Sequence, residues 1–298
     1  MKNTFVIPII RDDFIERCLE TLYKYTPHNF YVFVVDQTPR GLPCKYKTDP
    51  RIHMLIRPYR NLGFSKAVNT GFALCQTPYM TCLNDDVEFM NSQWWQGIED
   101  TFEVDEKIVA VNPNSPKEGA WGYGLTEYNK DTWTPREGFV RDEDGKSVIP
   151  VINGKPFEFK ENFTDEEYQS LLTDHPVWDK NSLCDGLACW CTVFKREALQ
   201  EVGLFDEKFY PGGGEDYSMM AEIYSRGKRA VGTTRSWAWH HWGKSKDDIS
   251  GKDPENPLFS RPRWNNLEEI WGNEFDVWGK DKSGNPLKRL IPKTIDEL

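Results

Sequence analysis

The chain has 298 residues and a net charge of −10, and 38% of its residues are hydrophobic, 14% aromatic and 28% charged. This composition is typical of a globular protein with a large core and one or two domains, and its acidity argues against a nucleic-acid partner. No apolar run reaches the roughly 18 residues that a membrane span needs, and the first run is too short for a signal peptide.

The first third of the chain alternates strands with helices. We predict strands over residues 5–10, 30–35, 52–56 and 79–83, a helix capped by Asp12 and Asp13, and a loop running into a helix over 61–76. Strands and helices that alternate at this spacing form βαβ units. The expected fold class is therefore α/β, with a mixed, mostly parallel sheet flanked by helices.

The rest of the chain is less regular. Residues 113–180 contain few periodic apolar runs and are expected to form an irregular insertion or lid, since long loops of this kind are usually functional or disordered. Beyond it we predict helices over 196–202 and 217–226, a strand over 229–239 and a short amphipathic helix around 264–271. Seven cysteines, mostly in apolar segments, indicate reduced thiols in a cytoplasmic protein.

Three acidic or amide side chains follow the strand at 79–83. Asn84, Asp85 and Asp86 stand where ligands bind in open α/β sheets, outside the carboxyl ends of the strands. Oxygen ligands there suit Mg²⁺ or Mn²⁺, which in turn suit a phosphorylated ligand. The alternative interpretation is a solvated acidic turn.

Two earlier segments carry groups that suit a nucleotide. Asp36 closes the second strand, where a carboxylate accepts hydrogen bonds from a base or a ribose, although it is equally a common turn residue. Gly63 allows a close approach of backbone to ligand. Asn61, Lys66 and Asn69 surround a helix start, where free N–H groups favour anions; the alternative is a plain helix terminus with surface polar groups.

Two later segments carry groups that suit catalysis. Three glycines precede Glu215 and Asp216 at a helix start, where the acids are either general bases or only favourable charges at the helix N-terminus. His240 and His241 end the last strand, and imidazole is a common metal ligand. Because side chains alternate along a strand, only one of these imidazoles is expected to face the site, and we favour His240.

Taken in order, these motifs resemble those of the family 2 glycosyltransferases of GT-A fold, especially the rhamnosyltransferase-like and galactofuranosyltransferase-like branch. The similar stretches are Asn61-Leu-Gly-Phe-Ser-Lys-Ala-Val-Asn69, Leu83-Asn-Asp-Asp-Val87, Phe194 to Phe209, Gly214-Glu-Asp-Tyr-Ser-Met219 and His240-His-Trp-Gly-Lys-Ser245. The resemblance spans residues 4 to about 246. It departs from the family pattern at Ile10-Arg-Asp12, where a polar turn is usual, and at Asn84, where the family has Asp.

The resemblance implies an inverting, metal-dependent transferase of polysaccharide biosynthesis, with a nucleotide-diphospho-sugar as donor and a glycan or other hydroxyl as acceptor. Mn²⁺ or Mg²⁺ would be bound by Asp86 and His240 with Asn84, and Asp216 would be the base with Glu215 as its alternative. The implied donor-binding residues are Pro8, Ile10, Asp36, Asn61, Gly63, Phe64, Lys66, Asn69, Asn84 and Asp85. The implied acceptor-side residues are Trp121, Trp133, Gly186, Trp190, Gly213 and Gly214.

The same resemblance implies a catalytic domain over 1–250. It would comprise a nucleotide-sugar half (1–112), the insertion (113–180) and an acceptor and catalytic half (181–250), followed by a C-terminal extension (251–298). Two other functions stay open. A nucleotidyltransferase would need a Gly-rich basic signature after the first strand, and Pro8-Ile-Ile-Arg11 lacks it. A non-catalytic sugar-nucleotide or glycan-binding module would not need the acids at 215 and 216.

Overall fold

The computed structural model describes residues 1–115, 139–141, 148–152, 154–158, 163–173, 183–241, 262–273, 275–276 and 278–293. The elements of the first half are β1 (Asn3–Ile9), α1 (Ile15–Tyr25), β2 (Phe30–Asp36), η1 (Cys44–Lys47), β3 (Met54–Ile56), α2 (Gly63–Leu74), β4 (Tyr79–Leu83), β5 (Val87–Phe89), α3 (Gln93–Phe102) and β6 (Ile108–Asn114). The later elements are β7 (Phe139–Arg141), β8 (Val148–Ile152), β9 (Lys155–Pro156), α4 (Asp165–Thr173), β10 (Leu183–Asp185), β11 (Cys191–Lys195), α5 (Arg196–Val202), α6 (Glu215–Ser225), β12 (Arg229–His240) and α8 (Pro262–Trp271).

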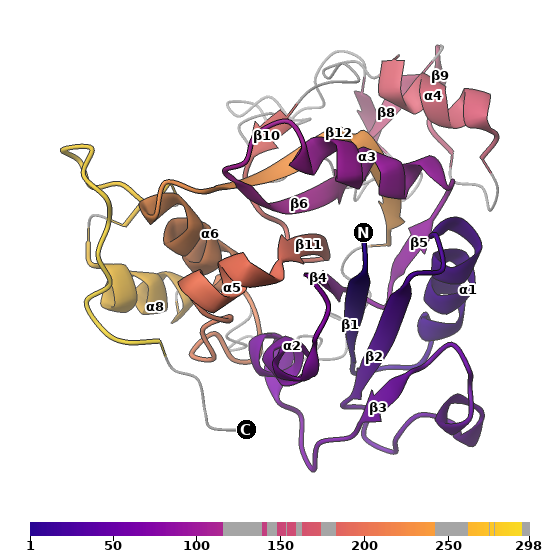
Figure 1. Ribbon diagram of the computed structural model, residues 1–298, viewed down its shortest axis with the longest axis horizontal. Helices are drawn as coiled ribbons and strands as arrows, with labels where there is room; N and C mark the ends of the chain where they lie inside the picture. Colours follow the sequence, from indigo (N-terminus) through magenta and orange to yellow (C-terminus); the bar gives the residue numbers. More distant parts are fainter. Residues whose placement is uncertain are drawn as a thin grey trace.

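Nine of the described strands form one sheet in the order β10-β12-β6-β11-β4-β1-β2-β3, with β5 paired to the end of β12 (Figure 1). The β4-β1-β2-β3 half is parallel, as the βαβ spacing predicted. β11 runs antiparallel between β4 and β6, and β12 runs parallel to β6. The sheet is therefore mixed, and the strands that carry the sequence motifs end at a shared edge.

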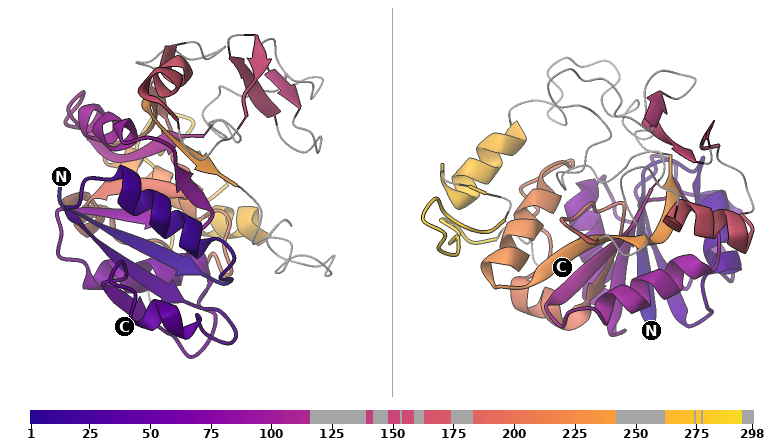
Figure 2. Two further views of the ribbon diagram at one scale, coloured as in Figure 1. Left: turned by 90° about the vertical axis from the view of Figure 1, so that its right-hand side faces the viewer. Right: turned by 90° about the horizontal axis from the view of Figure 1, so that it is seen from above.

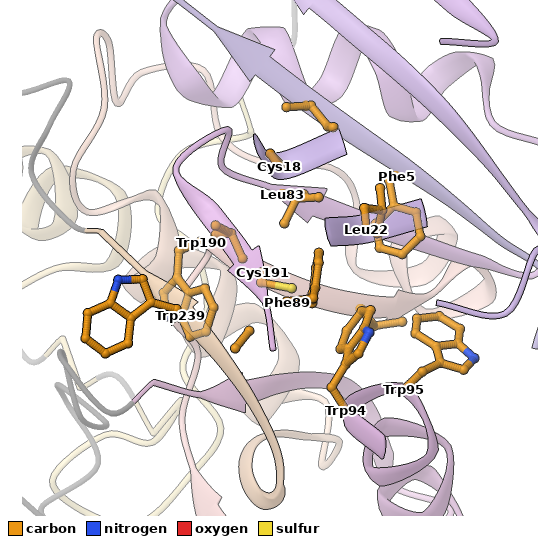
Figure 3. Close-up of a cluster of buried hydrophobic side chains, with 14 of the residues drawn as sticks. Phe5, Cys18, Leu22, Leu83, Phe89, Trp94, Trp95, Trp190, Cys191 and Trp239 are labelled. Atoms are coloured by element: carbon orange, nitrogen blue, oxygen red, sulfur yellow. The ribbon is translucent and has the colours of Figure 1, made fainter. Parts of the chain in front are cut away.

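Alternation along the central strands explains why both faces of the sheet are covered by helices. In β1, Phe5 and Ile7 pack into one core with α1 and α3, whereas Val6 packs into a second core with α2, α5 and α6. The first core is rich in aromatic rings: Phe89 stacks on Trp94 with centroids 4.1 Å apart (Figure 3). Burial on both faces is what makes these strands almost continuously apolar.

Most elements predicted from the sequence are present within a few residues of the expected bounds. The cap of α1 was predicted wrongly: Phe14 is the N-cap and makes no side-chain capping bond, because Asp13 instead accepts a hydrogen bond from Arg11 Nε at 2.7 Å. The prediction that residues 113–180 form an irregular segment was also partly wrong. Its described part contains α4 and a three-stranded sheet, β7-β8-β9, that stands apart from the large sheet (Figure 2).

The segment after residue 261 packs against α6. α8 places Leu267, Ile270 and Trp271 in a third cluster of buried side chains, and Trp271 Nε1 donates to Ser218 Oγ on α6 at 3.2 Å. Arg289 adds a charged contact, because its guanidinium lies 2.5 Å from Asp206 Oδ2. This extension therefore supports the helix whose first turn carries the predicted catalytic acids.

Two further expectations concern the whole chain. All seven cysteines are free thiols, and six of them are buried, as their apolar surroundings predicted. Within the described residues, no helix is both long enough and apolar enough to cross a membrane.

Candidate active site

Asp86 and His240 face each other at the end of the sheet. β5 pairs antiparallel with β12 so that His240 lies opposite Val87, directly beside Asp86. His240 Nε2 is 3.2 Å from Asp86 Oδ1 and 3.4 Å from Asn84 Nδ2, and the exposed fractions of Asp86 and His240 are only 5% and 4%. The structure thus brings together the three residues predicted to hold a metal.

This donor set fits a divalent cation. A carboxylate and an imidazole, both buried and converging on one point, are ligands that Mn²⁺ accepts, and Mg²⁺ is commonly held by one or two carboxylates together with substrate phosphates. Among the described residues, no three His, Cys, Asp or Glu side chains converge as a metal site. Asp86 and His240 are thus the two ligands of this kind that the described residues bring together here, with Asn84 beside them.

Asp85 and Asp86 differ in charge state because their partners differ. Burial and the neighbouring charge of Asp86 raise the pKa of Asp85 to about 8. Burial also raises the pKa of Asp86, but the charge and hydrogen bond of His240 outweigh burial and hold that pKa below its ordinary value. The charges of Asp13 and Arg11, which line a cleft at the ends of β1, β2 and β3, have smaller effects on the pKa of Asp85: Asp13 raises it and Arg11 lowers it.

His241 has a different partner from His240. Its Nε2 lies 2.9 Å from Glu88 Oε1, and Arg17 Nη2 donates to the other oxygen of the same carboxylate at 2.9 Å. The backbone N–H of His241 donates to the carbonyl of Asp86 at 3.0 Å. His241 therefore fixes the strand pairing that sets the metal pair, while its imidazole is directed to Glu88.

Trp190 lies at the centre of the site. Its ring stacks on the His240 imidazole with centroids 5.0 Å apart and planes 11° apart, and its carbonyl accepts the Asn84 N–H at 2.8 Å. Only 5% of Trp190 is exposed, because its ring belongs to the buried cluster that also contains Phe89 and Cys191 (Figure 3). The ring therefore packs against His240 rather than presenting an open face. Gly186, also predicted on the acceptor side, donates its N–H to Ala230 near the opposite end of β12.

An arginine-lined cleft of about 940 Å³ opens where β1, β2 and β3 end. Its lining residues are Ile10, Arg11, Asp12, Asp13, Gln37, Thr38, Pro39, Arg40, Gly41, Pro43, Arg57, Pro58, Tyr59, Arg60 and Asn61. Four arginines in one cleft of an acidic protein point to an anionic ligand. Sequence reasoning placed Ile10 and Asn61 here but missed the arginines, although the pair in Arg57-Pro-Tyr-Arg60 directly after a strand was a usable signal.

Asp36 lies next to this cleft, but both of its carboxylate oxygens are hydrogen-bonded to other groups of the protein. One carboxylate oxygen accepts the N–H of Thr38 at 3.0 Å and its hydroxyl at 2.6 Å. The other accepts the N–H of Leu42 at 2.8 Å and Arg57 Nη1 at 2.7 Å. Burial raises the pKa of Asp36, but these hydrogen bonds together outweigh it and lower the pKa. Asp36 thus shapes the cleft wall and orients Arg57.

Pro8 lies in β1 opposite Val35 of β2, two residues before the cleft-lining Ile10. Gly63, Phe64, Lys66 and Asn69 are not among the cleft-lining residues. They face the loop that precedes α6 instead: Asn69 Nδ2 donates to the Phe205 carbonyl, and Phe64 N–H to the Pro211 carbonyl, each at 2.8 Å. Trp121, Trp133 and Ser245 lie outside the described residues, so their predicted roles stay predictions.

The two acids that begin α6 have different environments. Glu215 is buried, 9% exposed, and its Oε2 accepts the N–H of Gly213, so it closes the glycine loop on itself. Asp216 is half-buried and its Oδ1 accepts the N–H of Tyr217 at 2.8 Å. Gly214, the N-cap, has a φ of 100°, a left-handed conformation that favours glycine. Burial raises the pKa of the Cys189 thiol, and the charges of these two acids raise it further.

Several solved structures are similar to this chain. Among solved structures, the chain is similar to GalNAc-T7 with UDP, GalNAc and Mn²⁺, with a TM-score of 0.58 and 15% identity over 91% of this chain and 48% of that chain. The mannosyltransferase PcManGT from Pyrobaculum calidifontis in complex with GDP-Man and Mn²⁺ has a TM-score of 0.48 and 16% identity over 80% of this chain and 56% of that chain. S. aureus TarS 1-349 has a TM-score of 0.49 and 15% identity over 80% of this chain and 60% of that chain.

The chain thus spans about half the length of GalNAc-T7 in that structure, and at 15% identity the likeness concerns the fold. A search of curated protein sequences finds no match. The family model described as glycosyl transferase family 2 matches residues 4–203, which include β1 to α5 and the Asn84-Asp85-Asp86 motif. With that match over most of its length, and with the GT-A fold that its sequence motifs implied, the chain belongs to glycosyl transferase family 2.

Proposed function

We propose that this protein transfers a sugar from a nucleotide-diphospho-sugar to a hydroxyl group of a glycan or other acceptor, with inversion at the anomeric carbon. The observation that carries the proposal is the buried Asp86–His240 pair at the carboxyl edge of the sheet, next to an arginine-lined cleft. Ligands of open α/β sheets bind at this edge. The structure of GalNAc-T7 with UDP, GalNAc and Mn²⁺, which shares the fold, supports the ligand class.

The donor would occupy the cleft and extend towards the metal pair. The arginines at 11, 40, 57 and 60 would attract its negative charge and the cleft would hold the nucleoside. A divalent cation held by Asp86 and His240 would act as a Lewis acid on the diphosphate leaving group. Asp85, the neighbour of Asp86 in the chain, would meet the part of the donor nearest the metal.

The transfer itself needs a base on the acceptor side. The acceptor oxygen forms a bond to the anomeric carbon while the bond from that carbon to the diphosphate oxygen breaks, and the acceptor proton passes to a carboxylate. We assign this role to Asp216, because each acid accepts one backbone N–H but Asp216 is half-buried whereas Glu215 is buried. Attack from the face opposite the leaving group inverts the anomeric centre.

The segment 113–180 would form the acceptor-side wall, with tryptophans that stack on sugar faces. Its described part lies around α4, and Tyr168 of α4 donates its hydroxyl to the carbonyl of Trp237 on β12 at 3.4 Å. This contact attaches the segment to the strand that ends in His240. Trp121 and Trp133 remain the candidates for direct acceptor contact.

The decisive experiment is a donor screen. UDP-, GDP- and dTDP-sugars would be tested with Mn²⁺ and with Mg²⁺ for protection against thermal unfolding and for donor hydrolysis. A nucleotide that binds only the native state should add about 2.7 kcal/mol of stability at a hundred times its dissociation constant. Absence of both protection and hydrolysis with every donor would reject the proposal. Protection without hydrolysis or transfer would indicate a binding module, and the anomeric configuration of a product would test inversion.

A further inference from the structure

We propose that the start of α2 is a clamp that positions the loop before α6, rather than an element that binds the nucleotide. The clamp consists of Gly63, Phe64, Lys66 and Asn69, and the loop comprises residues 205–214, directly before the helix that carries Asp216. The role rests on the proposed function, because the loop matters through Asp216, the first half-buried acid after it.

The first contact is made by Asn69, which is 1% exposed. Its Oδ1 accepts the N–H of Phe205 at 3.0 Å and its Nδ2 donates to the carbonyl of Phe205 at 2.8 Å. Nδ2 also donates to Glu207 Oε1 at 3.0 Å. An amide has two donor hydrogens, and both are taken by this loop. Asn69 therefore bonds to both the N–H and the carbonyl of Phe205, as a residue of a neighbouring β-strand does. Neither donor hydrogen of its side-chain amide is left for a nucleotide.

The second contact lies one turn earlier in α2. Phe64 N–H donates to the carbonyl of Pro211 at 2.8 Å, near the other end of the loop. This approach requires Gly63, which has a φ of 74°. A Cβ at that position would lie 2.8 Å from Tyr210 Cδ2 and 2.9 Å from the Pro211 carbonyl oxygen. Gly63 is thus explained by close packing against the loop.

A third contact is electrostatic. Lys66 Nζ lies 3.3 Å from Glu207 Oε2, and the exposed fractions of the two side chains are 18% and 5%. The same glutamate accepts the Asn69 amide at its other oxygen. Lys66, which the sequence analysis placed at a nucleotide phosphate, therefore directs its positive charge to the buried carboxylate of Glu207 in the loop.

These contacts hold the loop at residues 205, 207 and 211 and leave only the three glycines at 212–214 between the last anchor and α6. Glycine has more conformational freedom than any other residue, so an anchor directly before this run limits how far Asp216 can move. The clamp also begins at the cleft, because the cleft-lining Asn61 accepts the Gly63 N–H at 2.8 Å. We infer that the clamp fixes the base relative to the donor.

The proposal is tested with Asn69→Ala and Gly63→Ala, and with Thr70→Ala as the matched control on the same helix. The Thr70 hydroxyl donates to the Lys66 carbonyl of the same helix at 2.7 Å. Three properties would be measured in each variant: amide exchange over residues 205–216, affinity for nucleoside diphosphates with Mn²⁺, and turnover of the donor identified in the screen.

A clamp predicts faster exchange in the loop by about tenfold or more, since local opening free energies fall when contacts are removed. Turnover should fall by about a hundredfold, because small misplacements of a reacting group cost that much, while nucleoside diphosphate affinity stays within about threefold. Thr70→Ala should resemble wild type in all three. Unchanged exchange together with lost nucleotide affinity would overturn the proposal and make the segment a nucleotide-binding element.

Lys66 provides a milder pair of variants in case the first two fail to fold. Lys66→Met should raise loop exchange and lower turnover, and Lys66→Arg, which keeps the ion pair with Glu207, should restore both. Equal effects of the two substitutions would contradict the clamp. The exchange measurement needs no substrate. A wild-type protein that uses no donor would therefore reject the proposed function, whereas unchanged exchange in an active protein would reject the clamp alone.

Discussion

His240 Nε2 lies 3.2 Å from Asp86 Oδ1, and both side chains are almost completely buried. The pair exists because β12 runs beside β5 and places His240 opposite Val87. Buried polar groups need partners, and here each supplies one for the other. This contact predicts that His240, and not the adjacent His241, takes part in metal binding.

His240→Ala should weaken Mn²⁺-dependent binding of a nucleoside diphosphate by more than about tenfold, as expected when a group that holds a metal is lost. His241→Gln should retain most of that affinity, because its imidazole faces Glu88 at 2.9 Å. Titration calorimetry with and without Mn²⁺ measures both. A greater loss of Mn²⁺-dependent affinity in the His241 variant than in the His240 variant would reverse the assignment.

Asp216→Asn keeps the shape of the side chain and removes its basicity. Turnover should fall by roughly a hundredfold to ten-thousandfold, the usual contribution of a general base, while donor affinity stays near that of wild type. Glu215→Gln serves as the comparison, because Glu215 accepts the Gly213 N–H and should affect the loop rather than the proton. An active Asp216→Asn enzyme with an inactive Glu215→Gln enzyme would identify Glu215 as the base.

Asp36 makes stability depend on pH in an acidic window. Its pKa is lowered in the folded protein from an ordinary value of 3.8, so in acid the unfolded chain binds more protons and stability rises with pH. The contribution is present above pH 3.8 and is lost as pH falls through the lowered pKa. Asp36→Asn should cost about 1–3 kcal/mol at pH 7, and urea unfolding should show this difference shrinking below pH 3.8. A difference that is constant over pH would assign the loss to geometry instead.

Gly97→Ala should destabilise the protein even though alanine favours helices. A Cβ at this position would lie 2.0 Å from the carbonyl oxygen of Arg235, where α3 packs on β12. Backbone must move to accept it, at a cost of about 3 kcal/mol, against a gain of about 1 kcal/mol in helix propensity. Denaturant unfolding of Gly97→Ala and of the exposed neighbour Gln96→Ala separates the two effects. A Gly97 variant as stable as the Gln96 variant would contradict this packing.

Trp121→Ala and Trp133→Ala should lower the rate of transfer to the acceptor and leave donor hydrolysis unchanged. The expectation follows from the aromatic composition of the insertion, since rings commonly line sites for flat or ring-shaped ligands. The two reactions can be followed side by side with one donor. Parallel losses in both would assign these residues to the fold or to the donor site.

The motif residues Asn61 to Asn69 show the limits of local reasoning. Polar groups at a helix start suit an anion in any sequence, and nothing local distinguishes a phosphate from a carboxylate of the same chain. Only the packing of α2 against residues 205–211 shows that Asn69 and Lys66 are directed to Phe205 and Glu207. Asp36 is a similar case, because its partner Arg57 belongs to a different strand end.

The sequence by itself indicated the strands β1 to β4 and β12, most of the helices and the family, because apolar periodicity and short motifs are local properties of the chain. It also placed Asp86 at the end of a buried strand. It did not predict β5, β6, β10, β11 or α3. The tertiary structure alone decided which residues meet. The pairing of β5 with β12 joined His240 to Asp86, and four arginines from three separate loops formed one cleft. Such contacts depend on strand order and register, which join residues far apart in the chain and leave no local signal.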